Sequence, residues 1–251
     1  MKIDFTNKTV IVTGAGHGLG RSIAHAFSVR GAAVWACDIN AVALATTERE
    51  AEGDFRICNM DITDHLAINK IVEQIAREKG HVDILVNCAG GVGGQTAQPL
   101  EQVTPAQWQA LFDINVTGAF NCIQAVTPGM KAVGGGKIIN ISSRAGITTS
   151  LTGIQAYASA KAALIGLTRQ LAQELGEHKI NVNSIAPGFI RSNPSTEKQW
   201  DAYGEDGQKA LVESITLKRL GTPDDISNAV MFFSSDYANW ITGQTLSVAG
   251  G

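Results

Sequence analysis

Short runs rich in β-branched residues alternate with longer segments of helical periodicity along the whole chain. This alternation is typical of a parallel sheet with helices on both faces, because a parallel strand is reached only through a long crossover. The runs begin at Thr9, Ala32, Phe55, Val82, Gly136, Ile180 and Gly243. The helical patterns span residues 19–30, 41–51, 65–79, 105–131, 156–177 and 223–234. The sequence therefore predicts an α/β fold with one doubly wound parallel sheet of about seven strands.

The chain of 251 residues is long enough for one substantial core, and we expect one domain over residues 1–251. Residues 189–210 follow a Pro-Gly turn, are polar and show no clear periodicity, although they include Trp200 and Tyr203. Long irregular segments inside compact domains are commonly lids or binding loops. We therefore expect a substrate lid over residues 189–214, with a disordered surface excursion as the alternative.

The formal net charge is −3 and no block of lysine and arginine occurs, so we expect a small-molecule partner rather than nucleic acid or a membrane. No run of about 18 apolar residues and no signal peptide is present, which predicts a cytoplasmic protein. The cysteines form no C-x-x-C pair, and we expect them to be small buried residues rather than metal ligands or disulfides. They are Cys37, Cys58, Cys88 and Cys122. No metal site is expected.

A glycine-rich stretch, "VTGAGHGLG" at residues 12–20, joins the first predicted strand to the first predicted helix. Gly14, Gly18 and Gly20 let the backbone approach a pyrophosphate, which the N–H groups and the positive end of the helix dipole would hold. A glycine-rich run alone is weak evidence, because turns use glycine for steric reasons. Its position between a strand and a helix makes it a predicted dinucleotide site.

Asp38 ends the second predicted strand, 18 residues after Gly20. A carboxylate there can accept hydrogen bonds from both ribose hydroxyls of an adenosine and would repel a 2′-phosphate. Ile39 and Asn40 follow it, so no arginine or lysine stands next to Asp38 to neutralise such a phosphate. The sequence favours NAD over NADP, with a strand-end turn residue as the alternative reading of Asp38.

Tyr157 and Lys161 lie four residues apart in an alanine-rich helical segment and share one helix face. A nearby ammonium is expected to lower the pKa of the phenol, which is about 10 when unperturbed, toward that of a usable base. Ser142 and Ser143 end the preceding strand on the side where parallel sheets bind ligands. A hydroxyl there can bind a substrate oxygen while the phenolate removes its proton.

These motifs resemble the classical short-chain dehydrogenase/reductase family, from Lys8 to the C-terminus, in its 3-oxoacyl-[acyl-carrier-protein] reductase-like and secondary-alcohol dehydrogenase branch. They are "TGAGHGLG", "NCAG" at residues 87–90, Asn115 in "FDINVTGAF", "ISS" at 141–143, "YASAK" at 157–161 and "PG" at 187–188. The resemblance implies a Rossmann-type fold and NAD(P)-dependent oxidation or reduction of a secondary alcohol or ketone.

The resemblance also implies roles. Tyr157 would be the general acid/base, Lys161 would lower its pKa and bind the nicotinamide ribose, Ser143 would orient the substrate oxygen, and Asn115 would help to hold a water linked to Lys161. Asp61 and Ile62 would flank the adenine, and Ile190 and Ser192 would meet the carboxamide. The positions implied in cofactor binding are Gly14, Gly16, His17, Gly18, Leu19, Gly20, Asp38, Ile39, Asp61, Ile62, Asn87, Ala89, Gly90, Tyr157, Lys161, Pro187, Gly188, Ile190 and Ser192.

Two positions depart from the family pattern. Cys88 stands where a second asparagine is common, which puts a strand-stabilising side-chain bond in doubt. Ser192 stands where threonine is usual, which keeps the hydroxyl.

The substrate is less constrained. Arg144 and Arg191 flank the expected pocket, and one of them could meet an anionic group; structural arginines are the alternative. Gln155 could also line the pocket. An NADPH-dependent 3-oxoacyl-thioester reductase and a nucleotide-sensing protein without turnover remain alternatives, whereas a methyltransferase would not need Ser143, Tyr157 and Lys161 together. The resemblance implies a homotetramer in which the long helices beginning at residues 105 and 156 pack between subunits.

Overall fold

A computed structural model describes residues 3–251 and contains one parallel sheet of seven strands. The strand order is β3-β2-β1-β4-β5-β6-β7, so the chain builds outward from β1 to β3 and then returns to add β4 beside β1. The strands are β1 (Thr9–Thr13), β2 (Ala33–Asp38), β3 (Phe55–Asn59), β4 (Ile84–Asn87), β5 (Gly136–Ile141), β6 (Ile180–Pro187) and β7 (Thr245–Val248). The predicted sheet is confirmed, and the reversal between β1 and β4 marks where ligands bind in such sheets.

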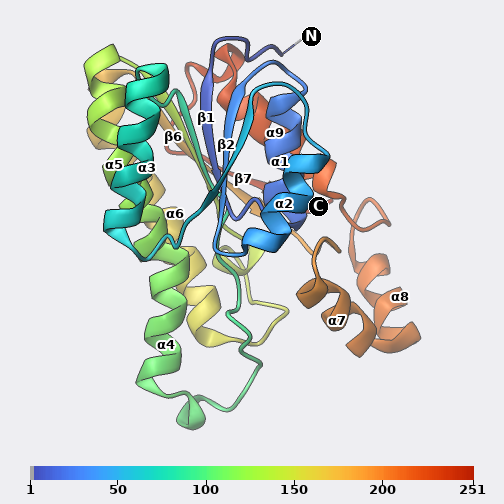
Figure 1. Ribbon diagram of the computed structural model, residues 1–251. Coiled ribbons are helices and arrows are strands. Elements are labelled where there is room, and N and C mark those ends of the chain that lie inside the picture. Colours follow the sequence, from blue (N-terminus) through green and yellow to red (C-terminus); the bar gives the residue numbers. More distant parts are fainter. Residues whose placement is uncertain (1–2) are drawn as a thin grey trace.

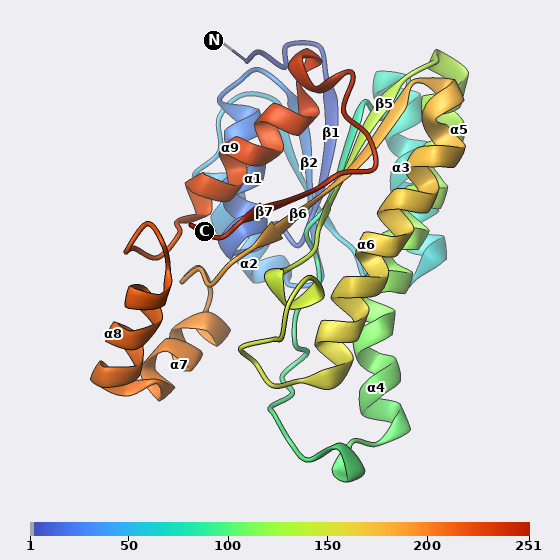
Figure 2. The same ribbon diagram turned by 180° about the vertical axis from the view of Figure 1, so that it is seen from behind.

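Helices cover both faces of the sheet (Figures 1 and 2). One face carries α1 (Gly18–Ser28), α2 (Ala41–Arg49) and α9 (Pro223–Ser234), and the other carries α3 (His65–Lys79), α5 (Gly118–Val133) and α6 (Gln155–Leu175). Each face buries its own apolar cluster, the first with Phe27 and Val230, the second with Trp35 and Met130. The two clusters explain why the strands read as almost continuous apolar runs rather than alternating ones.

The predicted helix over residues 105–131 is interrupted. It consists of α4 (Pro105–Phe112), a π-helical turn over Asp113–Thr117 and α5. Thr104 caps α4, because its side chain accepts a hydrogen bond from the Gln107 backbone while the Gln107 side chain reaches back to Thr104. The helical path from α5 to α4 is nearly continuous in Figure 1, and α4 extends beyond the sheet.

Residues 189–210 are not irregular, contrary to the prediction. They contain α7 (Pro194–Ala202) and the start of α8 (Gly204–Ser214), which pack against each other to one side of the sheet (Figure 1). The Asn193 side chain accepts hydrogen bonds from the backbones of Ser195 and Thr196 and so caps α7, with Pro194 in its first turn. Both helices have few apolar residues, which is why the periodicity was absent from the sequence.

The cysteines are free thiols. Cys37 and Cys122 are buried as expected, whereas Cys58 and Cys88 are partly exposed. Within residues 3–251, no helix combines the length and the apolar character needed to cross a membrane.

Candidate active site

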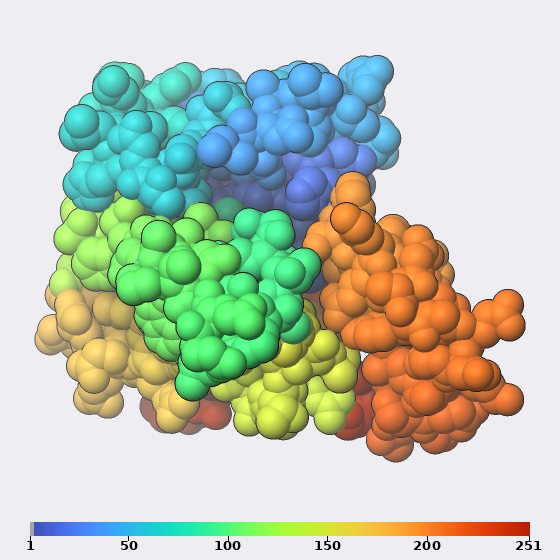
Figure 3. Space-filling view, turned by 90° about the horizontal axis from the view of Figure 1, so that it is seen from below, coloured from blue at the N-terminus to red at the C-terminus, as the bar shows by residue number. Residues whose placement is uncertain are grey.

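The predicted site residues gather at the carboxyl edge of the sheet. The glycine-rich turn follows β1, Asp38 ends β2, Asp61 and Ile62 follow β3, and residues 87–90 end β4. Figure 3 views this edge, where the dark-blue residues of the turn lie in a hollow between the green segment near α4 and the orange helices α7 and α8. The topology therefore brings together segments that are far apart in the sequence.

Two glycines of the turn are required by their surroundings. Gly14 has a φ of 68°, and a Cβ there would lie 2.8 Å from the Cα of Ala89, so the end of β4 touches the turn directly. Gly18 has a φ of 57°, and a Cβ would lie 2.9 Å from the main-chain oxygen of Ser192. A larger residue at either position would combine backbone strain with a collision. Ser192 thus lies against the N-terminus of α1. His17 and Leu19 are the neighbours of Gly18 in the chain.

Asp38 is buried and held by backbone groups. Its Oδ2 accepts a hydrogen bond of 2.9 Å from the N–H of Gly16, and its Oδ1 accepts one of 2.9 Å from the N–H of Asn40. Ile39 beside it is 68% exposed. The carboxylate of Asp38 therefore links β2 to the glycine-rich turn. The same carboxylate is the group expected to bind the adenosine ribose.

Asp61 and Ile62 are also fixed locally. The Asp61 Oδ1 accepts hydrogen bonds of 2.8 Å from the N–H and the hydroxyl of Thr63. The Ile62 carbonyl accepts one of 3.2 Å from Asn121, and its side chain packs against Gly118 at the start of α5. These contacts hold the loop after β3 against the sheet.

The sequence did not identify Thr13 as a site residue, although it is buried at the end of β1. Its Oγ1 accepts hydrogen bonds of 3.1 Å from the N–H groups of both Cys88 and Ala89. The strand junction put in doubt by Cys88 is therefore made by Thr13 instead. A hydroxyl residue directly before the first glycine was the available signal. Although Cys88 is partly exposed as a residue, burial of its thiol group raises the pKa to about 12, so this thiol is neutral at physiological pH.

Asn87 and Asn115 lie in buried polar networks. Asn87 donates a 2.9 Å hydrogen bond to Asn140, and its own Oδ1 is buried without a hydrogen-bond partner among the described residues. Asn115 lies in the π-helical turn, where its side chain accepts from the N–H of Gly91 and donates to the Gly91 carbonyl, at 2.9 and 2.8 Å. The turn thereby fastens the loop that contains Gly90 and Gly91.

Lys161 is 4% exposed, and its Nζ donates a 2.9 Å hydrogen bond to the main-chain oxygen of Ile141. Burial lowers the pKa of this ammonium to about 8. Ser142 is turned away from Tyr157, because its hydroxyl donates to the main-chain oxygen of Lys161 at 2.8 Å. Ser142 therefore holds the backbone of Lys161, whereas the next residue, Ser143, lies at Tyr157.

The side chains of Ser143 and Tyr157 lie close enough for hydrogen bonding between them to affect the pKa of the phenol. Burial raises the pKa of the Tyr157 hydroxyl, and the hydrogen bond with Ser143 acts in the opposite direction. The lowering expected from Lys161 is not found. Burial lowers the pKa of Lys161 to about 8 and raises that of Tyr157, so in the protein without bound ligands the amine loses its charge before the phenol ionises, although Nζ lies 5.9 Å from the centroid of the Tyr157 ring.

The three candidate substrate residues differ in their contacts. Gln155 donates a 3.0 Å hydrogen bond to the Gln98 carbonyl and so holds the loop before α4. Arg191 forms a 2.6 Å ion pair with Glu197 and lies over the Trp200 ring at 5.2 Å. Arg144 is exposed in the short helix after Ser143, and its side chain makes no hydrogen bond or ion pair within residues 3–251.

The segment after β6 completes the edge. Gly188 directly follows Pro187, the last residue of β6, and its N–H donates a 3.0 Å hydrogen bond to the Val248 carbonyl. Ile190 is buried and forms a β-bridge with Gly221. Phe189 contacts Trp200 of α7 and Tyr203, the residue between α7 and α8, with ring centroids 6.1 Å and 5.8 Å away.

Comparison with known proteins agrees with this geometry. The family model described as enoyl-(acyl carrier protein) reductase matches residues 14–251. The chain is 37% identical over 248 residues to (2S)-[(R)-hydroxy(phenyl)methyl]succinyl-CoA dehydrogenase subunit BbsD of Thauera aromatica, covering 98% of this chain and 96% of that protein. It is 35% identical to the 3-oxoacyl-[acyl-carrier-protein] reductase FabG of Thermotoga maritima, covering 97% of each.

A solved structure of 7α-hydroxysteroid dehydrogenase in complex with NADH and 7-oxo glycochenodeoxycholic acid superimposes with a TM-score of 0.89. It is 35% identical, and the match covers 99% of this chain and 95% of that one. The order of the motifs, the sheet topology and these full-length matches lead to one conclusion. The chain belongs to the short-chain dehydrogenase/reductase family of oxidoreductases, in the branch that contains 3-oxoacyl-[acyl-carrier-protein] reductases and secondary-alcohol dehydrogenases.

Proposed function

We propose that this protein is an NAD-dependent oxidoreductase that interconverts a secondary alcohol and a ketone, with Tyr157 as general acid/base. The observation that carries the proposal is the placement of Ser143, Tyr157 and the buried ammonium of Lys161 together at the carboxyl edge of the sheet, with Lys161 Nζ 5.9 Å from the centroid of the Tyr157 ring. Ser143 and Tyr157 can then contact the same substrate oxygen. Such an arrangement suits transfer of a proton to and from a carbinol oxygen.

The residues present fit a dinucleotide. The backbone of the glycine-rich turn lies at the N-terminus of α1, where a pyrophosphate is favoured by N–H groups and the helix dipole. Asp38 would bind the adenosine ribose, and the unpaired Oδ1 of Asn87 offers a buried acceptor beside the turn after β4. The other cofactor positions that the family resemblance implies would line the remainder of this site.

The bound nicotinamide would supply the hydride acceptor. For alcohol oxidation, Ser143 holds the substrate hydroxyl and Tyr157 removes its proton as the phenolate. Lys161 is protonated below its pKa of about 8. Its charge would favour the phenolate when the ammonium leaves the Ile141 carbonyl and moves closer to the Tyr157 hydroxyl. Asn115 holds the loop of Gly90 and Gly91 in place, and Gly90 lies beside the Nζ of Lys161.

Two features support NAD over NADP. The Asp38 carboxylate would repel a 2′-phosphate, and the residues after it, Ile39 and Asn40, are uncharged. An NADPH-dependent 3-oxoacyl-thioester reductase is the second candidate, which the likeness to a 3-oxoacyl-[acyl-carrier-protein] reductase favours. A nucleotide-sensing role is disfavoured, because Ser143, Tyr157 and Lys161 are all retained.

We further propose that residues 1–251 act as one domain with residues 189–214 as its substrate lid, since α7 and α8 stand beside the hollow at the carboxyl edge (Figure 3). A small molecule is the proposed partner, and Arg144 is the candidate for an anionic group because Arg191 is paired with Glu197. The family expectation of a homotetramer is tested by light scattering on the purified protein.

The test of function is steady-state oxidation of hydroxy acids, polyols, aryl alcohols and hydroxyacyl thioesters, with NAD and NADP in parallel. We expect turnover with NAD and a KM for NADP at least about tenfold higher. Tyr157→Phe should abolish turnover and leave the Kd for NADH nearly unchanged. A clear NADP preference contradicts the assignment of Asp38, and retained turnover in Tyr157→Phe contradicts the assignment of the base.

A further inference from the structure

Gly16 is held from two sides, at its N–H and at its carbonyl. The N–H binds the Asp38 carboxylate at 2.9 Å, whereas the carbonyl oxygen accepts a 2.6 Å hydrogen bond from Arg21 Nη2. A Cβ at Gly16 would lie 2.9 Å from the Asp38 carboxyl carbon, so the turn and the carboxylate are in contact. The orientation of this one peptide segment therefore depends on Arg21 and bears directly on Asp38.

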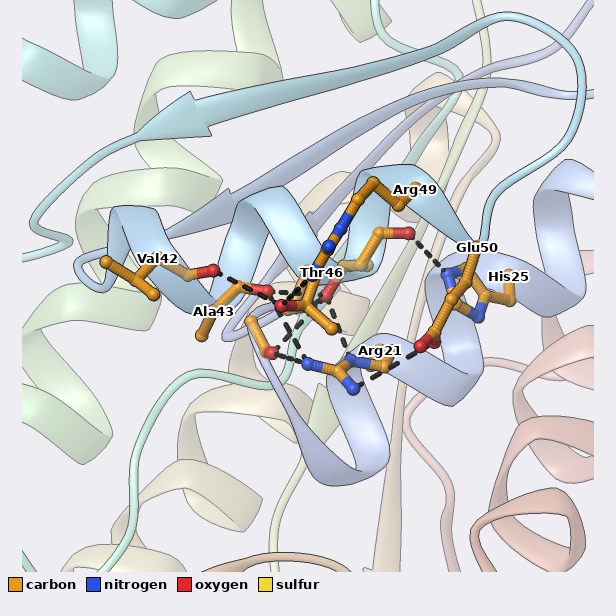
Figure 4. A network of polar contacts seen from close by, with 10 residues as sticks. Arg21, His25, Val42, Ala43, Thr46, Arg49 and Glu50 are labelled. Carbon is orange, nitrogen blue, oxygen red and sulfur yellow. Dashed lines mark hydrogen bonds and ion pairs between the residues drawn. The ribbon is translucent and has the colours of Figure 1, made fainter.

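Arg21 is in turn positioned by Thr47 of α2, whose side chain is fully buried. Arg21 Nε donates a 3.0 Å hydrogen bond to the Thr47 hydroxyl, and that hydroxyl donates at 2.9 Å to the Ala15 carbonyl in the turn. His25, one helical turn after Arg21, contacts the Thr47 carbonyl at 2.8 Å. Figure 4 shows Arg21 and His25 of α1 directed toward the last turns of α2. The glycine-rich turn, α1 and α2 thus meet at the Thr47 hydroxyl.

The charged guanidinium group of Arg21 is directed toward acceptors of the protein itself. Its Nη2 faces the carbonyls of Gly16 and Ala43, and its Nη1 lies 4.0 Å from the Glu50 carboxylate. The sequence places no cation next to Asp38, but the structure brings this one against the turn from α1. Because its N–H groups face the protein, Arg21 is arranged to hold the backbone rather than to neutralise a 2′-phosphate.

We propose that Arg21 and Thr47 are positioning residues for NAD: they fix the Gly16 peptide so that its N–H holds the Asp38 carboxylate in the orientation that receives the adenosine ribose. This inference rests on the proposed function. Neither residue contacts the expected ribose position through a free polar group, because the hydrogen bonds of both side chains go to the protein. Their effect passes through Gly16 and Asp38.

The proposal makes cofactor affinity depend on the hydroxyl of Thr47 and not on its shape. Thr47→Val keeps the volume and removes the hydrogen bonds, whereas Thr47→Ser keeps the hydroxyl. Thr46→Val is the matched control, because Thr46 lies on the same helix and, within residues 3–251, its hydroxyl forms hydrogen bonds only with Val42 and Arg49 of that helix. Arg21→Met removes the other member of the network and serves as the second variant if Thr47→Val does not fold.

The experiment measures the Kd for NADH by fluorescence titration, with the melting temperature of each variant without cofactor. We expect Thr47→Val and Arg21→Met to raise the Kd about tenfold, and Thr47→Ser and Thr46→Val to remain within about threefold of the unchanged protein. The KM for NAD should rise by the same factor, with a much smaller change in kcat. The preference for NAD over NADP should fall, because only NAD uses a fixed Asp38.

A lowered melting temperature with an unchanged Kd in both Thr47→Val and Arg21→Met overturns the proposal, since the network would then be structural only. Failure of the unchanged protein to bind NADH is a different outcome. It contradicts the proposed cofactor itself and, with it, the role of the network.

Discussion

The Nζ of Lys161 donates a 2.9 Å hydrogen bond to the main-chain oxygen of Ile141, deep inside the protein. The pair has a measurable consequence for stability, because burial lowers the pKa of the ammonium from 10.5 to about 8. Below pH 8 Lys161 is charged in both the folded and unfolded chain, and the folded state bears the full desolvation cost.

Lys161→Met should therefore increase the free energy of unfolding at pH 7 by about 1–3 kcal/mol while abolishing turnover. From pH 8 upward the unfolded chain keeps its proton and the folded chain loses it, so the unchanged protein gains stability with rising pH. The advantage of Lys161→Met should shrink between pH 7 and 9.5 in urea denaturation. An advantage that is constant with pH would show that the charge is not its source.

Ser143→Ala should impair catalysis more than stability. Loss of the Ser143 hydroxyl, which lowers the pKa of Tyr157, leaves the effect of burial unopposed, so a smaller fraction of phenolate is present at any given pH. We expect kcat/KM for alcohol oxidation to fall about 10²–10³-fold and its rise with pH to move to higher pH.

Ser142→Ala is the matched control for Ser143→Ala. Its hydroxyl binds the Lys161 carbonyl, so we expect a loss of about 1 kcal/mol in the free energy of unfolding and a pH profile close to that of the unchanged protein. If the two alanine variants shift the pH profile equally, Ser143 has no special link to Tyr157.

Thr13→Val should weaken the junction between β1 and β4. The hydroxyl is the acceptor for two backbone N–H groups, and its loss leaves both without this partner. We expect a decrease of about 1–3 kcal/mol in the free energy of unfolding, measured by urea denaturation, and a higher Kd for NADH. Thr13→Ser should recover most of both. An unaffected Thr13→Val variant would mean that water replaces the hydroxyl.

Arg144→Ala and Arg191→Ala should have different effects on substrates. Arg144 is free of protein partners among the described residues, so its removal should raise the KM of acidic alcohols about tenfold and leave neutral alcohols unchanged. Arg191 is paired with Glu197 and stacked on Trp200, so its removal should alter both classes alike through the lid. Steady-state kinetics on matched acidic and neutral alcohols checks this, and equal effects of Arg144→Ala on both classes would contradict the anion assignment.

The sheet and its covering helices were predictable because their signals are local and repeated. Apolar runs bounded by glycine and helical patterns of apolar residues place every strand, and the helix over His65–Lys79 agrees with the structure at both ends. The helices of the lid were missed because they bury little apolar surface. The signal that was overlooked is Asn193 followed by Pro194, the same arrangement of cap and proline that starts α4 at Thr104.

The site residues were predictable as a set, but their partners were not. Spacing places Tyr157 and Lys161 on one helix face, yet it cannot show that the long lysine side chain turns to the Ile141 carbonyl. Likewise, Thr47 belongs to none of the sequence motifs, and the packing of α2 against α1 brings its hydroxyl to the turn. Contacts chosen by rotamers and by tertiary packing leave no local pattern.

The π-helical turn over Asp113–Thr117 sets the phase between α4 and α5. One residue corresponds to about 100° of rotation in an α-helix, so an added residue turns everything before it relative to everything after it. Removing one residue there would restore a regular helix, but it would rotate α4 away from its neighbours and carry Asn115 off the Gly91 backbone. A chain with a shortened turn could therefore have a more regular helix and a misaligned pocket, so the length of this segment is itself a functional property.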